Sequence, residues 1–161
     1  MIMEELLKRV SELLREKGLT LATAESATGG LISHLITEVP GSSDYYKGSV
    51  TAYSNGAKIS LLGVKAEVLL RQGAVSPQVA MEMAMGGLQA FNVDICISDT
   101  GIAGPDGGSM KKPVGLFYLG LAYQKDAWYR QHNYSGGRVE NKKAATAAAL
   151  NWLKEFLQDL E

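Results

Sequence analysis

The fold is decided by the stretch Leu19-Thr20-Leu21-Ala22-Thr23-Ala24-Glu25-Ser26-Ala27-Thr28-Gly29-Gly30. Its first half, from Leu19 to Ala24, is short and mostly apolar and predicts a buried strand. After the two glycines, apolar residues recur at helical spacing until Pro40 ends the pattern, at Leu31, Ile32, Leu35, Ile36 and Val39. The chain therefore passes from a strand through a sharp turn into a helix, and Ser26 lies on the turn.

The turn at Ser26 has two interpretations. Paired glycines let backbone N–H groups approach a ligand closely, and the dipole of the following helix adds positive potential there. Ser26 would then be a nucleophile or part of an anion site. Serine also begins many helices as an N-cap. The turn by itself leaves both interpretations open.

Helices and strands alternate on both sides of this turn. Apolar residues on one face predict a helix from Ile2 to Leu14, with Gly18 as its C-cap. Periodicity and turn residues predict later strands over 48–53, 93–98, 114–123 and 127–134. They predict later helices over 57–62, 66–71 and 77–88, and a long helix after Arg138. Ser76 is the expected N-cap of the helix over 77–88. The pair Gly86-Gly87 predicts close backbone packing.

The order of these elements predicts the fold class. The last two strands are separated only by Gln124-Lys125-Asp126, which favours an antiparallel hairpin. Alternating strands and helices before them favour a sheet covered by helices on both faces. We therefore predict a single domain over residues 1–161, a three-layer α/β/α domain with a mixed, mostly parallel sheet that ends in an antiparallel hairpin.

Composition excludes several classes of function. The chain has 16 basic and 17 acidic side chains, so no charge excess favours nucleic acid or a membrane surface. No apolar run approaches the roughly 20 residues of a membrane span, and the acidic, amphipathic start from Met1 to Glu5 is unlike a signal peptide. The single cysteine, Cys96, lies in an apolar run and excludes a disulfide framework. We therefore expect a cytoplasmic protein.

The two histidines allow a Ser-His-Asp triad to be considered. His34 lies in the helix after Ser26, and His132 lies in the last predicted strand; neither has an acidic partner nearby in the sequence. Distant residues can converge in the fold, so the sequence does not eliminate a triad. No cysteine cluster or histidine pair has the spacing of metal ligands, and we expect neither a metal nor a cofactor.

A Ser-Lys pair is another possible arrangement, because a neutral lysine can take the proton of a serine. Lys58 follows the strand that ends at Tyr53, and active-site groups of open α/β sheets gather at strand ends. Free lysine has a pKa of about 10.4, so Lys58 would need burial or a neighbouring cation to act as a base near neutral pH. Tyr53 would orient the amine or relay its proton. The competing interpretation makes Lys58 a solvated helix residue and Tyr53 an aromatic residue at the edge of the core.

A glycine-rich loop follows the strand over 93–98. It runs from Thr100 to Ser109 and continues to Pro113, and it matches neither the dinucleotide-binding nor the P-loop pattern. Its backbone N–H groups and the Thr100 hydroxyl can hold a phosphate or form an oxyanion hole. Three cations are available to assist: Lys111, Lys112 and Arg138.

Several motifs in series resemble one family. They are Ala24-Glu25-Ser26-Ala27-Thr28-Gly29-Gly30, Tyr53-x-Asn55-x-x-Lys58, Gly73-Ala74-Val75-Ser76, Thr100-Gly101-Ile102-Ala103-Gly104-Pro105 and Lys112-Pro113-Val114-Gly115. In this order they resemble the CinA C-terminal domain, a family that includes the stand-alone nicotinamide mononucleotide deamidases. The resemblance runs from Leu6 to Leu157, nearly the whole chain.

The resemblance implies an amidohydrolase that converts nicotinamide mononucleotide and water to nicotinate mononucleotide and ammonia. It implies that Ser26 is the nucleophile, Lys58 its general base and Tyr53 an assisting residue. Backbone N–H groups near Gly29 or from Gly101 to Gly104 would stabilise the oxyanion. The residues implied to bind the substrate are Thr28, Gly29, Gly30, Asn55, Thr100, Gly101, Ile102, Ala103, Gly104 and Arg138.

The chain departs from the family pattern at two places. The family often has cysteine after the serine, where this chain has Ala27. It also tends to show a Gly-Asp-Arg segment, where this chain has Gly136-Gly137-Arg138. The first departure spares the implied Ser-Lys dyad, and the second leaves the role of Arg138 open.

Two other functions stay open from the sequence. One is a non-catalytic nucleotide-binding module that uses Ser26 as a cap or phosphate donor, and the other is an amidase for another small amide. The expected partner is a small-molecule substrate, without nucleic acid or membrane. A homo-oligomer is also expected, because Trp128, Tyr129 and Trp152 offer apolar contact area, although buried positions explain these residues equally well.

Overall fold

A five-stranded sheet lies at the centre of the computed structural model, which describes residues 2–161. The strands are β1 (Leu21–Glu25), β2 (Tyr46–Thr51), β3 (Ile95–Gly101), β4 (Leu116–Tyr123) and β5 (Asp126–Asn133). The helices are α1 (Met3–Lys17), α2 (Leu31–Thr37), α3 (Asn55–Leu62), α4 (Ala66–Gln72), α5 (Pro77–Phe91) and α6 (Arg138–Asp159), with a short 3-10 helix η1 (Ser42–Asp44). Among the described residues, no helix has both the length and the apolar character needed to cross a membrane.

The sheet is mixed and has the strand order β2-β1-β3-β4-β5. β1 pairs in parallel with β2 and β3, whereas β4 runs antiparallel to its neighbours β3 and β5. Four of the five strands therefore point the same way, and β4 and β5 form a hairpin at one side of the sheet. The predicted mixed, mostly parallel sheet with a terminal antiparallel hairpin is confirmed.

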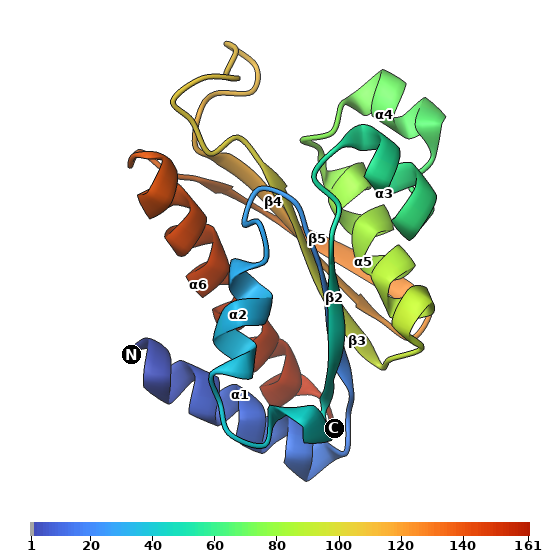
Figure 1. Ribbon diagram of the computed structural model, residues 1–161, viewed down its shortest axis with the longest axis vertical. Helices are drawn as coiled ribbons and strands as arrows, with labels where there is room; N and C mark the ends of the chain where they lie inside the picture. Colours follow the sequence, from blue (N-terminus) through green and yellow to red (C-terminus); the bar gives the residue numbers. More distant parts are fainter. Residues whose placement is uncertain (1) are drawn as a thin grey trace.

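Helices cover both faces of the sheet, as predicted (Figure 1). α1, α2 and α6 cover one face, where Leu21 of β1 and Ile97 of β3 belong to the larger core cluster. α3, α4 and α5 cover the other face, where Ala22 and Cys96 of the same two strands are buried. Successive residues of a strand point to opposite faces, so each strand contributes to both layers.

Gly86 of α5 allows a close approach between α5 and α3. A Cβ atom at this position would lie 1.9 Å from the carbonyl oxygen of Leu62, the last residue of α3. The predicted close packing at this glycine is confirmed. Because α3 also carries Lys58, this contact fixes the helix that holds the lysine.

Several predicted boundaries differ from the structure by two or three residues, and three of these differences lie near the ends of β2 and β3. β2 ends at Thr51, since the carbonyl oxygens of Ala52 and Tyr53 accept hydrogen bonds from Lys58 instead of joining the sheet. α3 begins two residues early because Ser54 Oγ accepts from Ala57 N–H at 3.1 Å and caps it. β3 continues to Gly101, two residues into the predicted glycine loop, because its end pairs with β4.

Candidate active site

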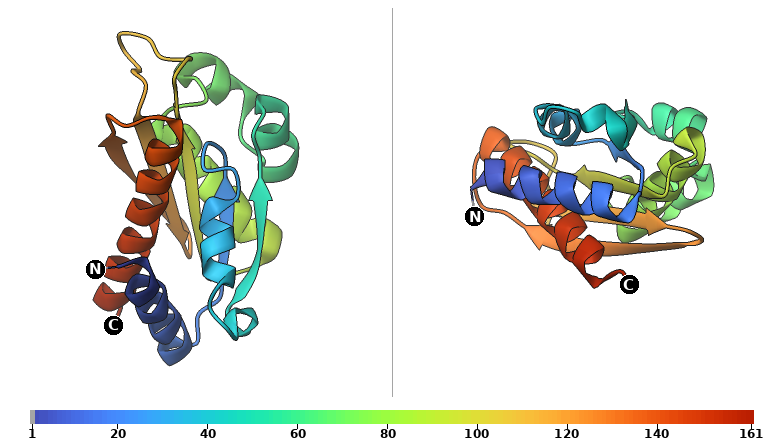
Figure 2. Two further views of the ribbon diagram at one scale, coloured as in Figure 1. Left: turned by 60° about the vertical axis from the view of Figure 1, so that its left-hand side comes forward. Right: turned by 90° about the horizontal axis from the view of Figure 1, so that it is seen from below.

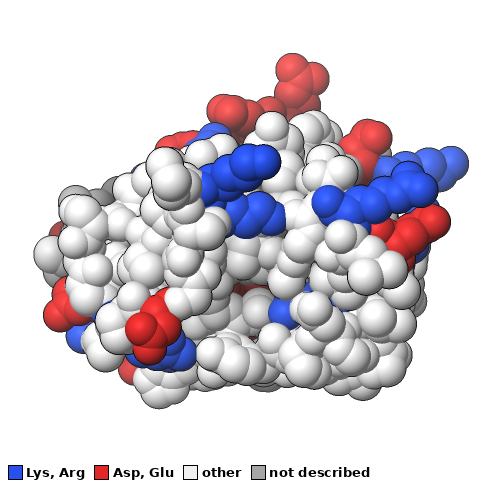
Figure 3. Space-filling view, turned by 90° about the horizontal axis from the view of Figure 1, so that it is seen from above, with Lys and Arg blue, Asp and Glu red and all other residues white. Residues whose placement is uncertain are grey.

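The candidate site lies at the carboxyl ends of β1, β2 and β3. Ser26 follows β1 directly, Lys58 lies in α3 just after β2, and Thr100 lies near the end of β3. These parallel strands end at the same edge of the sheet, which is where open α/β sheets bind ligands. The loop between β3 and β4 extends beyond this edge (Figure 2). Figure 3 shows this end of the molecule, with two groups of Lys and Arg side chains beside a hollow.

Lys58 and Ser26 are in direct contact. Lys58 Nζ lies 2.9 Å from Ser26 Oγ and 3.0 Å from the carbonyl oxygens of both Ala52 and Tyr53. A neutral amine has two N–H donors and one lone pair. With both donors given to the carbonyl oxygens, the lone pair faces the Ser26 hydroxyl and can accept its proton. The arrangement has the geometry of a Ser-Lys dyad.

Lys58 is buried, with only 2% of its surface exposed. Removal from water disfavours an ammonium, so burial lowers the pKa of Lys58 from its usual value of 10.5, while a negative charge on the nearby Asp99 would act in the opposite direction. The competing interpretation of Lys58 as a solvated helix residue is therefore wrong. A buried lysine with a lowered pKa is suited to act as a base.

Tyr53 contacts Lys58 through its backbone rather than its ring. The ring is 63% exposed, and its hydroxyl accepts a hydrogen bond from Arg138 Nη2 at 3.2 Å. Arg138 Nη1 also donates to the carbonyl oxygen of Gly104 at 2.7 Å. The tyrosine therefore orients the amine with its carbonyl oxygen, while its phenol contacts Arg138 instead of relaying a proton. Arg138 connects the start of α6 with the β3–β4 loop.

A cavity of about 150 Å³ opens beside Ser26 and Lys58. Besides these two, the residues that line it are Ala27, Tyr53, Asn55, Ala74, Val75, Thr100, Gly101, Ala103 and Arg138. Five of the ten predicted binding residues are therefore brought together here, namely Asn55, Thr100, Gly101, Ala103 and Arg138, whereas Ile102 and Gly104 do not line the cavity. The Thr100 hydroxyl donates to the carbonyl oxygen of Ala74 at 2.7 Å, so it holds the cavity wall in place.

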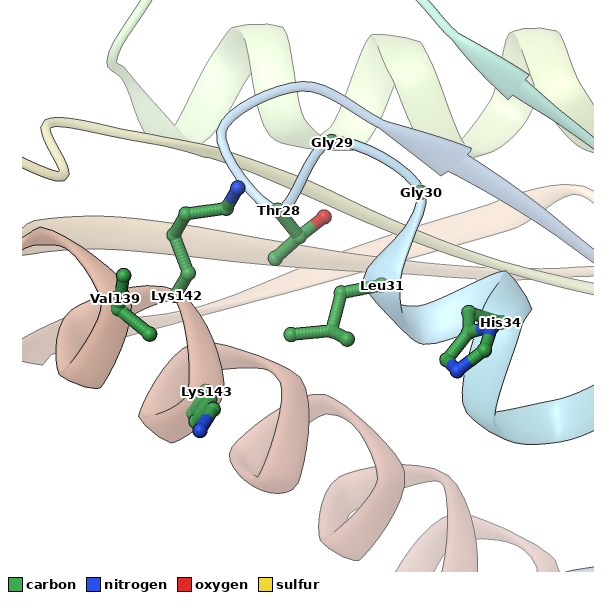
Figure 4. A pocket seen from close by; sticks show the side chains of 8 residues that line it. All are labelled: Thr28, Gly29, Gly30, Leu31, His34, Val139, Lys142 and Lys143. Atoms are coloured by element: carbon green, nitrogen blue, oxygen red, sulfur yellow. The ribbon is translucent and has the colours of Figure 1, made fainter. Parts of the chain in front are cut away.

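Three predicted substrate-binding residues lie elsewhere. Thr28, Gly29 and Gly30 line a separate cavity of about 380 Å³ between the start of α2 and α6 (Figure 4). Lys142 of α6 extends toward the turn at Gly29 in this view. Thr28 is only 1% exposed and its hydroxyl contacts buried carboxyl groups, so it is not free to bind a substrate.

The backbone of the Ser26 turn (residues 26–30) has one available donor beside the serine. Gly29 N–H donates to the carbonyl oxygen of Ser26 at 3.0 Å, so it is not free to stabilise an oxyanion as expected. Ala27 N–H has no acceptor among the described residues, and Ala27 lines the cavity. The N–H group that follows the serine is therefore a candidate oxyanion donor.

Two fully buried carboxyl groups accept hydrogen bonds from the Ser26 turn and from the start of α2. Asp99 of β3 accepts hydrogen bonds from Ser26 N–H at 3.0 Å and from Thr28 N–H at 3.1 Å. Glu25, at the end of β1, accepts from the N–H groups of Ile32 and Ser33 at 2.9 Å each. These contacts fix both the serine and the start of α2.

Sequence reasoning did not assign a role to these two carboxyl groups. Glu25 lies inside the stretch that decides the fold, and Asp99 lies between a buried strand and the glycine loop. Acidic residues are almost never fully buried without partners. An acidic residue at the end of a predicted buried strand is therefore the signal that points to such a contact. Ala74 and Val75 also line the cavity, although they were not predicted as binding residues. They belong to the motif Gly73-Ala74-Val75-Ser76.

The structure does not support a triad with either histidine. Contrary to the expectation from the sequence, His34 has an acidic partner nearby, because its Nε2 lies 3.1 Å from Glu38 Oε1, but both side chains are exposed. The ring of His132 stacks on Tyr134 with centroids 5.7 Å apart. Neither lines the cavity beside Ser26. Within residues 2–161, no group of three or more His, Cys, Asp or Glu side chains is arranged to hold a metal ion.

Comparisons with known sequences agree on one family. A family model described as the CinA C-terminal domain matches residues 3–157. A relative from Clostridium kluyveri is 51% identical over 152 residues, which are 94% of this chain and 36% of the relative. A CinA-like protein from Geotalea daltonii is 47% identical over 148 residues, 92% of this chain and 36% of that protein. The chain thus spans about a third of the length of the curated relatives that it matches.

Solved structures have the same fold along nearly the whole chain. The competence/damage inducible protein CihA from Agrobacterium tumefaciens has a TM-score of 0.93 at 40% identity, covering 98% of this chain and 96% of that chain. The competence damage-inducible protein A (ComA) from Klebsiella pneumoniae has a TM-score of 0.96 at 30% identity, covering 100% of both chains. The α/β/α architecture is therefore shared with experimentally determined structures.

Proposed function

Because the chain belongs to the CinA C-terminal domain family, we propose that it is an amidohydrolase that deamidates nicotinamide mononucleotide. The products are nicotinate mononucleotide and ammonia. The observation that carries the proposal is the 2.9 Å contact between the buried Lys58 Nζ and Ser26 Oγ. A serine that only capped a helix would have no need of a buried amine.

The first half of the reaction forms an acyl-enzyme. Neutral Lys58 takes the proton of Ser26 as Oγ bonds to the carboxamide carbon, and the carbonyl electrons move to oxygen. Ala27 N–H donates a hydrogen bond to the developing oxyanion. One such donor lowers the activation barrier by about 3–4 kcal/mol. The carbonyl then re-forms, the C–N bond breaks, and the departing nitrogen takes the proton from Lys58 to leave as ammonia.

The second half returns the free enzyme. Lys58 takes a proton from water, whose oxygen attacks the acyl carbon and displaces Ser26 Oγ. The proton on Lys58 returns to Ser26 Oγ, and the carboxylic acid of the product releases its own proton to solvent as nicotinate mononucleotide leaves. The pyridinium of the substrate withdraws electrons from the carboxamide carbon, which eases attack by a serine activated by one lysine.

The substrate fits the site in two parts. The cavity of about 150 Å³ is smaller than the roughly 300 Å³ of typical ligand pockets. It accommodates the carboxamide ring, and the ribose phosphate lies outside, toward Arg138 at the start of α6. Arginine is well suited to a phosphate because its guanidinium offers paired donors.

The test is ammonia release from nicotinamide mononucleotide by purified variants. We expect Ser26→Ala and Lys58→Met to lose roughly a thousandfold or more in kcat/KM. Methionine fills most of the lysine volume without the amine. The matched controls are Ser60→Ala on the exposed side of α3 and Lys125→Ala in the β4–β5 turn, both on exposed residues. Full activity of Ser26→Ala would exclude the covalent mechanism.

The small cavity also favours a second candidate, an amidase for a smaller amide. A substrate without ribose phosphate would occupy the cavity alone and would not need Arg138. Free nicotinamide and simple aliphatic amides, compared with the mononucleotide by kcat/KM, separate the two candidates. We also propose that the protein acts in the cytoplasm and as a homo-oligomer, as expected from the sequence.

A further inference from the structure

Beneath the Ser26 turn, the Thr28 hydroxyl connects two buried carboxyl groups. Thr28 Oγ1 lies 2.7 Å from Glu25 Oε1 and 2.5 Å from Asp99 Oδ1. Both distances are those of strong O–H···O hydrogen bonds in which one partner is charged. Glu25 and Asp99 have no exposed surface, and Thr28 is 1% exposed, so water does not supply donors here.

The number of protons in this cluster is constrained by chemistry. A threonine hydroxyl has one proton and can donate it to one acceptor only. If Glu25 and Asp99 were both ionised, one of them would face the lone pairs of Thr28 Oγ1 with no proton between the oxygens. An unpaired buried acceptor of this kind is strongly disfavoured. The cluster therefore holds one proton in addition to that of Thr28.

Asp99 is the better place for this proton. Glu25 accepts the N–H groups of Ile32 and Ser33 at 2.9 Å each. Its Oε2 also accepts from the Thr23 hydroxyl at 3.1 Å, so an ionised Glu25 is well supplied with donors. Complete burial raises the pKa of Asp99 to about 6, against the lowering effect of a hydrogen bond from Thr28. When the Thr28 proton goes to Glu25, Asp99 has lost that donor, and its protonated form is the one that can complete the hydrogen bond to Thr28 Oγ1.

No cation holds Asp99 in its ionised form by direct contact. The charged groups that act on it are Glu25 from β1 and Lys58 from α3, and Lys58 Nζ is engaged with Ser26 and two carbonyl oxygens. Lys142 of α6 lies at the far side of the turn, beside Gly29 (Figure 4). On β4, the residue paired with Asp99 is Leu119.

We propose that Asp99 is a positioning residue that carries a proton in the resting site. Its hydroxyl donates to Thr28, and the Thr28 hydroxyl donates to the ionised Glu25. The neutral Asp99 still accepts Thr28 N–H through its carbonyl oxygen Oδ2, and its hydroxyl oxygen Oδ1 stays within reach of Ser26 N–H as a weaker acceptor. It also places no negative charge near Lys58 that would favour the ammonium. Only this last consequence rests on the proposed function, since the proton itself follows from the hydrogen-bond geometry.

Infrared spectroscopy of the full chain tests the proton directly. At about pH 6, ordinary carboxyl groups are ionised, so a carboxylic acid C=O band identifies the cluster. We expect the band in the native chain and in Ser26→Ala, and its loss in Asp99→Asn. A native chain without the band, or an Asp99→Asn variant that keeps it, would overturn the proposal.

Kinetics with the same variants separate this proposal from the proposed function. In Asp99→Asn, the amide can donate to Thr28 Oγ1 and accept from Thr28 N–H but loses the bond from Ser26 N–H. We expect kcat to fall by about tenfold, while the acidic limb of kcat/KM keeps its position because one neutral group replaces another. If Asp99 were ionised in the native chain, its replacement would instead move the acidic limb of kcat/KM to lower pH in the variant.

Thr28→Ser keeps the hydroxyl and should retain the native pH profile of kcat/KM. If no form of the chain releases ammonia, the proposed function fails, and the infrared result still decides the proton.

Discussion

Lys58 is nearly inaccessible to solvent, yet three oxygen atoms surround its amine. The two carbonyl oxygens fix the direction of the amine, and burial makes its neutral form accessible. The same residue can therefore accept the Ser26 proton and later return it to the leaving nitrogen. In the proposed mechanism, Lys58 would supply both steps, since its surroundings accommodate the neutral and the protonated amine.

The pH dependence of kcat/KM should show the titration of Lys58. The amine is active only when neutral, so activity should fall on the acidic side as Lys58 gains its proton. Because burial lowers the pKa of Lys58, the midpoint should lie below 10.5. A profile measured on the native chain gives this midpoint. A flat profile on the acidic side would show that the base is another group.

Arg138 should affect binding more than chemistry. It contacts Tyr53 and Gly104 but neither Ser26 nor Lys58. We expect Arg138→Ala to raise KM by about tenfold or more and to change kcat by only a few-fold, because a lost phosphate contact weakens ground and transition states alike. Arg130→Ala, which removes the exposed pair with Glu155, is the matched control. A loss confined to kcat would contradict this role.

At the scale of elements, α3 depends on its contact with α5. Gly86→Ala would place a Cβ atom 1.9 Å from Leu62 O, so the two helices would have to separate. We expect a loss of several kcal/mol in the free energy of unfolding, as for other overpacked positions, and reduced activity because Lys58 moves with α3. Gly56→Ala is the control, since a Cβ atom there meets only Ser54 Oγ at 3.9 Å. Urea unfolding of both variants measures the difference.

The start of α2 depends on a carboxyl group from another element. Its N-cap residue, Gly30, has no side chain, and Glu25 of β1 accepts the N–H groups of Ile32 and Ser33 instead. We expect Glu25→Ala to reduce the free energy of unfolding by about 3 kcal/mol or more, because several buried donors lose their acceptor. Glu12→Ala, which removes only an exposed ion pair, should change it by less than about 1 kcal/mol. Equal effects of the two substitutions would contradict the capping role.

Sequence patterns predict these elements well wherever an apolar face is continuous. The layers, the sheet type and the hairpin follow from periodicity and from short turns such as that around Gln124. The pattern fails at the ends of β2 and β3. The carbonyl oxygen of Tyr53 accepts a hydrogen bond from Lys58 instead of joining the sheet, whereas Thr100 stays in β3 and its hydroxyl donates to the carbonyl oxygen of Ala74. Within the site, Ser26 and Lys58 belong to a motif, whereas the contact between Asp99 and the Ser26 turn joins residues 73 positions apart. Local sequence indicates that a buried Asp99 needs a hydrogen-bond partner, but it does not identify the Ser26 turn as that partner.

At the scale of the whole molecule, the exposed aromatic residues indicate where copies of the chain would meet. Trp128 and Tyr129 are 42% and 48% exposed on the edge strand β5, whereas Trp152 is 6% exposed and belongs to the core. Of the three aromatic residues expected to offer contact area to another copy, Trp128 and Tyr129 are exposed and Trp152 is not.

We expect sedimentation of the native chain to show an oligomer. Trp128→Ser should shift it toward the monomer, because exposed apolar area on an edge strand favours association. Leu70→Ser on α4, where Leu70 is 87% exposed, is the control and should leave the oligomer unchanged. A native chain that sediments as a monomer at every concentration would contradict this expectation.

The central claim is that Ser26 forms a covalent acyl-enzyme with the carboxamide substrate. Rapid acid quenching of the native chain during turnover of nicotinamide mononucleotide, followed by peptide mass spectrometry, tests it most directly. We predict an acyl adduct on the peptide that contains Ser26, absent from Ser26→Ala and from Lys58→Met. Turnover at the native rate with no adduct on Ser26, or an adduct on another residue, would contradict the claim.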